Sequence, residues 1–133
     1  MTVRSIGRGL RILHDALPVD DCPFDWSVQH RVATWGRTGA TELGAVAPPI
    51  EKLVVCHGDA CSPNTVIAPN GTFAGHVDLG MLGLADRWAD LAVATYSLEW
   101  NYEGDRAAEF YDAYGVERDH EREDFYRRLW DVT

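Results

Sequence analysis

The chain has 133 residues, 46% of them hydrophobic, and five tryptophans; this composition excludes a disordered chain and suits one domain over 1–133. The formal net charge of −9 argues against nucleic acid or an anionic membrane surface as a partner, and it is compatible with a cationic small molecule. No apolar run approaches the ~20 residues of a membrane helix, and three cysteines without a disulfide-framework spacing favour the reducing cytoplasm.

The N-terminal part of the chain predicts helices followed by a connection. Apolar residues at spacings of three and four predict an amphipathic helix over 3–17, ended by Pro18. A loop over 20–25 leads to a weaker helix that contains Val28, Val32 and Trp35. The stretch 36–49 is rich in Gly, Thr, Ala and Pro, which indicates a connection.

The rest of the chain predicts a small β element and then helices. A short buried strand is expected over 53–56, and strands over 65–68 and 72–77 flank the turn signal Pro69-Asn70-Gly71. Helices follow over 85–98, over 106–114 with Gly115 at the end, and over 122–130. The expected fold is therefore α+β and mainly helical with a small central β-hairpin, and the tryptophans are expected in its core.

The hairpin spacing brings polar side chains together at its open end. With Asn70-Gly71 as a two-residue turn, Asn64 faces Val77, and Asp78 follows directly. The facing pairs inside this hairpin are Ala68–Phe73, Ile67–Ala74, Val66–Gly75 and Thr65–His76. Asp59 precedes Asn64 by five residues, so three oxygen-bearing side chains are expected to line one cleft.

Such a group of oxygen ligands suits Mg²⁺, which is usually held by one or two protein groups together with substrate phosphates. Asp78 supplies a charge and Asn64 a neutral carbonyl oxygen. Asp59 is left to accept or orient a hydroxyl proton, and this division of roles is the arrangement of phosphoryl transfer.

The same segment resembles a known family. His57-Gly58-Asp59 with Asn64, followed by Val77-Asp78-Leu79-Gly80, looks like the catalytic segment of aminoglycoside phosphotransferases and related small-molecule kinases. The stretch 84–92, Leu-Ala-Asp-Arg-Trp-Ala-Asp-Leu-Ala, looks like the helix that follows in that family. The resemblance is tight from about 53 to 98 and weaker elsewhere.

The resemblance implies a role for each matching residue. Asp59 would be the catalytic carboxylate, and Asn64 and Asp78 would be the Mg²⁺ ligands. His57 would be a buried hydrogen-bonding residue of the catalytic loop, and Asp90 would tie to the backbone of that loop. The implied activity is transfer of a phosphoryl group from ATP to a hydroxyl of a small, cationic acceptor of the aminoglycoside type, as in antibiotic resistance.

The resemblance covers the C-terminal lobe of a protein-kinase-like fold only. The N-terminal β lobe, which holds ATP through a strand lysine, is expected to be absent, because the first predicted helix begins near residue 3. The single lysine, Lys52, precedes the strand that leads into the catalytic loop. We therefore expect a homodimer or a partner chain to cover the surface of the missing lobe.

The residues expected to bind the acceptor match the family less closely than the catalytic segment does. Met81 stands where many members of the family have arginine. Glu99 and Glu103 offer acidic groups for an acceptor, and Asp131 matches the acidic and aromatic ending of the family. These three residues are the candidate substrate-binding residues.

Two other interpretations of the sequence remain open. A catalytically silent C-lobe remnant that binds or scaffolds is the alternative to an enzyme. Cys56 and Cys61 with His57, and His76 as a further ligand, are an alternative metal site, although the spacing lacks the second ligand pair of a structural zinc site.

Overall fold

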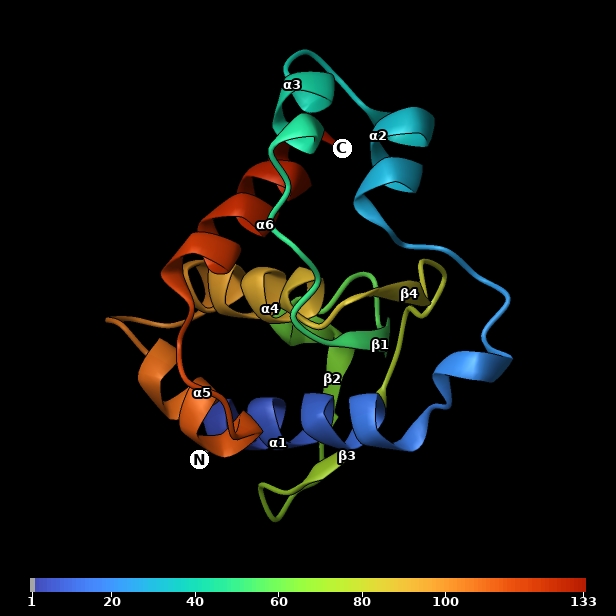
Figure 1. Ribbon diagram of the computed structural model, residues 1–133. Coiled ribbons are helices and arrows are strands. Elements are labelled where there is room, and N and C mark those ends of the chain that lie inside the picture. The colour runs from blue at the N-terminus through green and yellow to red at the C-terminus, as the bar shows by residue number, and fades with distance from the viewer. Residues whose placement is uncertain (1) are drawn as a thin grey trace.

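The computed structural model describes residues 2–133 and is mainly helical, as the sequence predicts. Figure 1 shows α4 at the centre, with α6 on one side and α1 with α5 on the other. The helices are α1 Thr2–Ala16, α2 Val28–Trp35, α3 Ala40–Ala45, α4 Trp88–Asn101, α5 Ala107–Tyr114 and α6 His120–Val132. The strands are β1 Leu53–Cys56, β2 Thr65–Ile67, β3 Phe73–His76 and β4 Gly83–Asp86.

The core is built around α4, which is buried on nearly every side. The buried residues of this helix include Leu91, Ala92 and Ala94, all without measurable exposure. A helix that is apolar around its circumference fits only the inside of a domain. The main helix–helix contacts of the domain are those of α4 with α6 and of α1 with α5.

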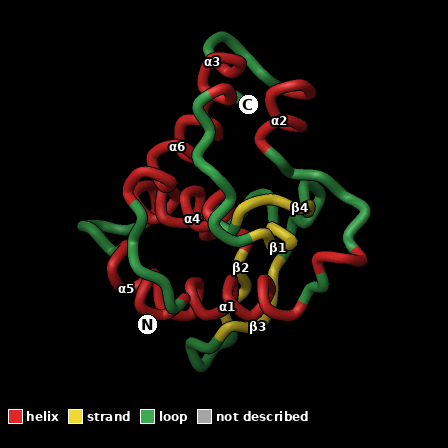
Figure 2. Tube along the Cα trace, viewed as in Figure 1, coloured by secondary structure: helices red, strands yellow, loops and turns green. Residues whose placement is uncertain are grey.

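The strands form two antiparallel pairs, β1 with β4 and β2 with β3. Figure 2 shows these short strands, in yellow, next to α1 and α4. The helix predicted from residue 85 starts too early, and the sequence pattern gives no sign of the β1–β4 pairing. Instead, Ala85 pairs with Val54 and Asp86 with Leu53, and α4 begins only at Trp88.

The predicted register of the hairpin is right at its open end and wrong at its turn. Thr65 pairs with His76 and Val66 with Gly75, but Ile67 pairs with Phe73, so the strands are shifted by one residue. The turn is closed by the N–H of Gly71, which donates to Ala68 O, and only Gly71 within it has a positive φ (84°). Pro at the second position fits this turn, whereas a two-residue hairpin turn of the primed type requires positive φ at Asn70 as well.

The stretch predicted as a connection over 36–49 contains the short helix α3, which packs on α6. Six residues with a glycine give too little periodicity to be recognised as a helix in a sequence. The helix predicted over 106–114 is confirmed as α5, and Gly115 ends it in the left-handed conformation, with φ at 91°.

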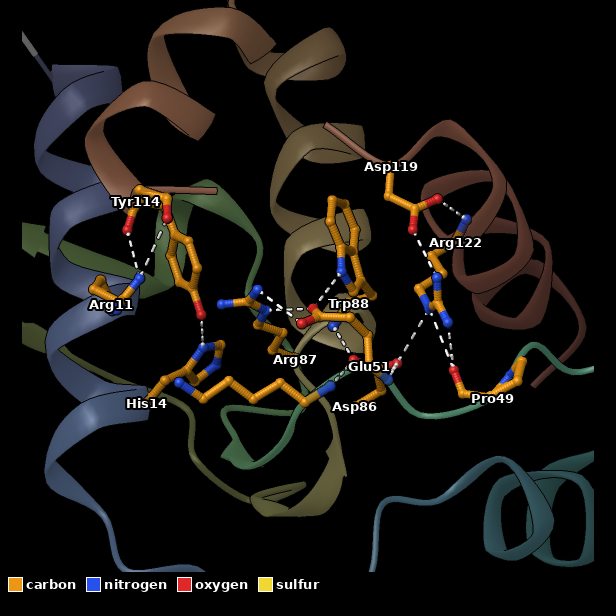
Figure 3. A network of polar contacts seen from close by, with 12 residues as sticks. Arg11, His14, Pro49, Glu51, Asp86, Arg87, Trp88, Tyr114, Asp119 and Arg122 are labelled. Carbon is orange, nitrogen blue, oxygen red and sulfur yellow. Dashed lines mark hydrogen bonds and ion pairs between the residues drawn. The ribbon is translucent and has the colours of Figure 1, made fainter. Parts of the chain in front are cut away.

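A polar network ties the segment before β1 to two helices (Figure 3). The carboxylate of Glu51 accepts hydrogen bonds of 2.7 and 3.0 Å from Arg87, at the start of α4. Arg122 of α6 donates to Pro49 O at 2.8 Å and lies 3.7 Å from the buried carboxylate of Asp86. The loop that enters β1 is thus held from both sides.

None of the helices within residues 2–133 is long and apolar enough to cross a membrane.

Candidate functional site

The candidate site is the loop that joins β1 to β2, over residues 57–64. Gly58 in this loop has φ at 89°, and a Cβ at this position would collide with the backbone carbonyl of Met81. Only glycine combines that conformation with that close approach. The loop is therefore pressed against the turn that follows β3.

The loop is anchored by a single buried carboxylate on α4. Asp90 is 1% exposed and accepts the N–H of His57 at 2.6 Å and the N–H of Gly58 at 3.0 Å. A charged acceptor makes such hydrogen bonds short and strong. Two consecutive backbone amides are fixed in this way at the end of β1.

His14 of α1 completes the environment of Asp90. Its Nε2 lies 2.8 Å from Asp90 Oδ2, and its Nδ1 lies 2.8 Å from the hydroxyl of Tyr114 on α5; Figure 3 shows the latter contact. Burial alone would raise the pKa of Asp90, but the hydrogen bonds from His14, Gly58 and His57 outweigh it and hold the pKa below its ordinary value. Asp90 is therefore ionised in the folded protein at neutral pH.

The side chain of His57 has a defined tautomer. The N–H of Asp59 donates to His57 Nδ1 at 3.1 Å, so this nitrogen is an acceptor. The proton then resides on Nε2, which donates to Val77 O at 2.8 Å. Both ring nitrogens are engaged with the backbone, so His57 joins the loop to the end of β3 and is not available as a base.

Asn64 connects Asp59 to the residue before Asp78. Its Nδ2 donates to Asp59 O at 2.8 Å, and its own carbonyl accepts the N–H of Val77 at 3.0 Å. The Oδ1 of the amide is left to accept a further contact. Asp78 is exposed and is the one residue with a side chain, within 2–133, that has a positive φ (59°). Backbone strain of this kind clusters at functional sites.

In the structure, Cys56 and His57 of the alternative metal site with cysteine ligands are engaged in other contacts. His57 has no free nitrogen, and the thiol of the buried Cys56 donates to Asp86 O at 3.4 Å. Burial, together with the neighbouring Asp59 carboxylate, raises the pKa of Cys61 to about 12, so this thiol stays protonated. Cys56, His14 and Asp90 also lie close together, but His14 and Asp90 bond to each other directly.

A pocket of about 350 Å³ opens beside Asp59. Besides Asp59, Gly58 and Met81, it is lined by the aromatic residues Trp26, Trp35 and Trp130 and by Arg31, Arg37 and Thr133. The expectation that the tryptophans lie in the core is right for Trp26 and Trp88 but wrong for Trp35 and Trp100, which are 39% and 56% exposed. The sequence gives no sign of Arg31 and Trp35 as pocket residues, because only the tertiary packing of α2 brings them to Asp59.

The three predicted substrate-binding residues, Glu99, Glu103 and Asp131, do not line this pocket. Glu99 lines a separate pocket of about 380 Å³ between α4, α5 and α6, where it accepts from Arg127 at 2.8 Å. The carboxylate of Asp131 accepts from the hydroxyl of Tyr96 at 3.3 Å, and Glu103 is exposed in the turn after α4. The sequence order of these acidic residues thus says little about their position relative to Asp59.

Comparison with known proteins gives consistent results. Residues 2–126 match the model of the phosphotransferase enzyme family. An aminoglycoside 3'-phosphotransferase from Streptomyces fradiae is 37% identical over 156 residues, covering 96% of this chain and 58% of that protein. A streptomycin 3''-kinase from Streptomyces griseus is 43% identical over 86 residues, covering 60% of this chain and 32% of that protein.

A solved structure of an aminoglycoside phosphotransferase from Streptomyces rimosus, in complex with ADP and streptomycin, superimposes with a TM-score of 0.75 at 32% identity. The match covers 99% of this chain and 62% of that one. The chain therefore spans less than two thirds of the length of these relatives.

Replacing Asp90 by asparagine tests the anchor. Asp90→Asn is expected to lower the free energy of unfolding by about 3 kcal/mol near neutral pH, because one buried N–H loses its acceptor and His14 loses its charged partner. A carboxyl group whose pKa is lower in the folded than in the unfolded protein stabilises the folded state. This stabilisation is complete above the unfolded-state pKa of about 3.9, and it is lost as the pH falls through the pKa of the folded state. Urea unfolding at a series of pH values should show the difference from the wild type narrowing below about pH 4.

The control for this experiment is Asp112→Asn, which removes an exposed carboxylate paired with Arg4. It should change the free energy of unfolding by less than about 0.5 kcal/mol. A wild-type advantage over Asp90→Asn that stays constant down to about pH 2 would contradict the assigned role of the carboxylate.

Proposed function

Because this chain belongs to the phosphotransferase enzyme family, we propose that it carries the catalytic loop, the metal ligands and the acceptor site of an ATP- and Mg²⁺-dependent O-phosphotransferase. The acceptor is a hydroxyl of a small molecule, in line with the aminoglycosides named for the relatives. The proposal includes a cytoplasmic location, which fits the three free cysteines within residues 2–133.

The observation that carries this proposal is the pair of hydrogen bonds through Asn64. The side chain of Asn64 binds the carbonyl of Asp59, and its backbone carbonyl binds the N–H of Val77, next to Asp78. Asn64 thus contacts Asp59 directly, and it contacts the residue that precedes Asp78. Phosphoryl transfer relies on positioning and on electrostatic stabilisation, so fixed neighbouring groups are what the reaction requires.

Each residue takes a separate role in this proposal. Asp59, which lines the 350 Å³ pocket, accepts or orients the proton of the acceptor hydroxyl. Asn64 Oδ1 and the Asp78 carboxylate are hard oxygen donors of the kind that hold Mg²⁺. The bound ion would neutralise charge on the nucleotide phosphates. His57 and Asp90 keep the loop in position and take no proton from the substrate.

The proposal places the rest of the nucleotide site outside residues 2–133. Lys52 stands at the entry to β1, where its backbone N–H lies 3.5 Å from Asp86 Oδ1, and it does not belong to the candidate site. Phe24, Leu79 and Met81 are each more than 40% exposed on and near the turn after β3. A second copy of the chain, or another chain, would cover this apolar surface.

Light scattering on the concentrated chain tests this association. The expected outcome is a mass well above the 14.8 kDa of one chain, because apolar side chains gain free energy when they leave water. Replacing Phe24, which is 59% exposed, by serine should lower the fraction of the larger species. A strict monomer at every concentration would contradict the proposed cover.

Titration calorimetry with MgATP tests the nucleotide site. Binding in the micromolar range is expected, and it should weaken strongly when EDTA removes Mg²⁺, because the ion links the protein oxygens to the phosphates. Heat from MgATP that is unaffected by EDTA would contradict the proposed metal ligands. Undetectable binding would favour a silent lobe that acts as a binding or scaffold module.

Four variants test the assignment of roles in a phosphotransfer assay, with one cationic and one neutral acceptor. Asp59→Ala is expected to lower turnover by about 10²–10⁴ at saturating nucleotide, because the group that activates the hydroxyl is lost. Asp78→Ala should weaken MgATP binding as well as turnover, and Asn64→Ala should do the same to a smaller extent, because water can replace a neutral ligand.

Cys61→Ser is the matched control, since its thiol lies beside Asp59 but remains protonated. It should leave turnover nearly unchanged. If Cys61→Ser abolished activity while Asp59→Ala retained it, the kinase assignment would be wrong, and the thiol would be the group to study.

A further inference from the structure

A second pocket, the Trp35 pocket, adjoins the pocket at Asp59. Its volume is about 340 Å³, and Trp26, Trp35 and Met81 line both pockets, so the two are neighbours. Each volume is at the small end of the range for ligand pockets, which is roughly 300–1,000 Å³. Together the two pockets have room for a ligand of two rings, one of which reaches Asp59.

The side chains of the Trp35 pocket suit a positively charged group. Among residues 2–133, no arginine or lysine lines this pocket, and Asp25 is its one acidic side chain. The aromatic side chains of Phe24, Trp26 and Trp35 line it as well. A cation that enters the pocket therefore meets a carboxylate and several aromatic rings.

Asp25 lies shortly before α2 and supplies the negative charge. Its Oδ1 accepts the backbone N–H of Ser27 at 2.7 Å. Hydrogen bonding to Ser27, together with the nearby imidazole of His30, holds the pKa of Asp25 below its ordinary value. The carboxylate is exposed and forms no ion pair within residues 2–133, so its charge is available to a ligand.

Trp35, the last residue of α2, supplies an aromatic surface. Its ring centre lies 5.6 Å from that of Trp26 and 5.5 Å from that of His30, and 39% of its surface stays exposed. Trp26 already has a cationic partner, because the guanidinium carbon of Arg31 lies 4.4 Å from its ring centre. The exposed part of Trp35 is left for a ligand. The face of an indole ring attracts a cation more strongly than that of any other aromatic side chain.

We propose that the Trp35 pocket binds an ammonium group of the acceptor, between the indole of Trp35 and the carboxylate of Asp25, while another ring of the acceptor places its hydroxyl at Asp59. The inference rests on the proposed function and assigns the residues that recognise the charge of the acceptor. Both contacts require a positive charge on the ligand, since a neutral hydroxyl in the same place gains neither the cation–π attraction nor an ion pair.

Three sugars test the proposal without nucleotide: 6-amino-6-deoxytrehalose, trehalose and 6-amino-6-deoxyglucose. The first two have two rings and differ only in the amino group, and the third has one ring. Binding to the wild-type chain is followed by titration calorimetry and by tryptophan fluorescence at about pH 8, where an alkylammonium group is charged and carboxylates are ionised.

The aminotrehalose is expected to bind about tenfold more tightly than trehalose, because its ammonium group meets both Trp35 and Asp25. It should also bind more tightly than the single aminated ring, which fills one pocket only. Equal affinities of the two trehaloses, tighter binding of trehalose, or no binding of any of the three would overturn the proposal. A single ring that bound as tightly as the aminotrehalose would overturn the span over both pockets.

Replacement of Trp35 assigns the preference to its ring. Trp35→Leu keeps an apolar side chain but removes the aromatic face, so the roughly tenfold preference should fall to about threefold, whereas Trp35→Phe should retain most of it. Trp100→Leu is the matched control and should leave the preference unchanged, because Trp100 is 56% exposed on α4 and lines neither pocket. A folded Trp35→Leu that kept the full preference would overturn the role of Trp35.

Asp25→Asn removes the charge and keeps an oxygen for the N–H of Ser27, so the turn before α2 should remain. The preference for the ammonium group should fall about threefold, and added salt should weaken it in the wild type more than in Asp25→Asn, because exposed charges are screened. Asp112→Asn, which removes an exposed carboxylate paired with Arg4, is the control. An Asp25→Asn variant with the full preference and the full salt dependence would exclude Asp25 from the site.

The sugar comparison separates this inference from the catalytic proposal. If MgATP failed to bind while the aminotrehalose was preferred through Trp35, the catalytic proposal would fail and this inference would stand. If phosphotransfer depended on Asp59 but the wild-type chain bound the two trehaloses equally, this inference would fail and the proposed function would stand.

Discussion

The buried carboxylate of Asp90 is the group on which the candidate site depends. From the first turn of α4 it fixes two consecutive amides of the loop over 57–64, and His14 of α1 binds the same carboxylate. A buried charge is unfavourable unless it is paired and hydrogen bonded, and here three donors from two parts of the chain, α1 and the start of the loop, satisfy it. The same contacts therefore join α1, α4 and the end of β1, and they set where the loop begins.

The path of the loop beyond that anchor is determined locally. Gly58 turns the chain against Met81, His57 reaches the carbonyl of Val77, and Asn64 closes the loop on Asp59. Every one of these contacts lies within residues 57–81, between the end of β1 and the turn after β3. Local contacts hold a loop at a low entropy cost, because few residues must be ordered to close it. This explains how Asn64 stays in contact with Asp59 and with Val77, the residue before Asp78, on irregular backbone.

The difference between local contacts and contacts between distant parts of the chain explains which features the sequence predicts and which it does not. The order Asp59, Asn64, Asp78 and the open end of the hairpin follow from spacing alone, and α5 follows from periodicity with Gly115 at its end. The strand β4 cannot be recognised in the sequence, because its identity depends on pairing with β1 and not on its own pattern. The shift of the hairpin at Ile67 escapes the spacing argument because Pro69 has no N–H with which to pair with Thr72, and the N–H of Ala68 donates to Thr72 O instead.

The pocket wall is the clearest case of information that only the fold provides. Arg31 and Trp35 come from α2 and Trp130 from α6, and no spacing in the sequence places them beside Asp59. The groups proposed to carry out the chemistry thus belong to one local segment, whereas several residues of the pocket wall belong to helices that pack around it. Substitutions in α2 can change the charge and shape of the pocket beside Asp59 while the loop, held by Asp90, keeps its geometry. Membership of a family therefore indicates the reaction at this site more directly than it indicates the acceptor, whose recognition has to be argued from the pocket itself.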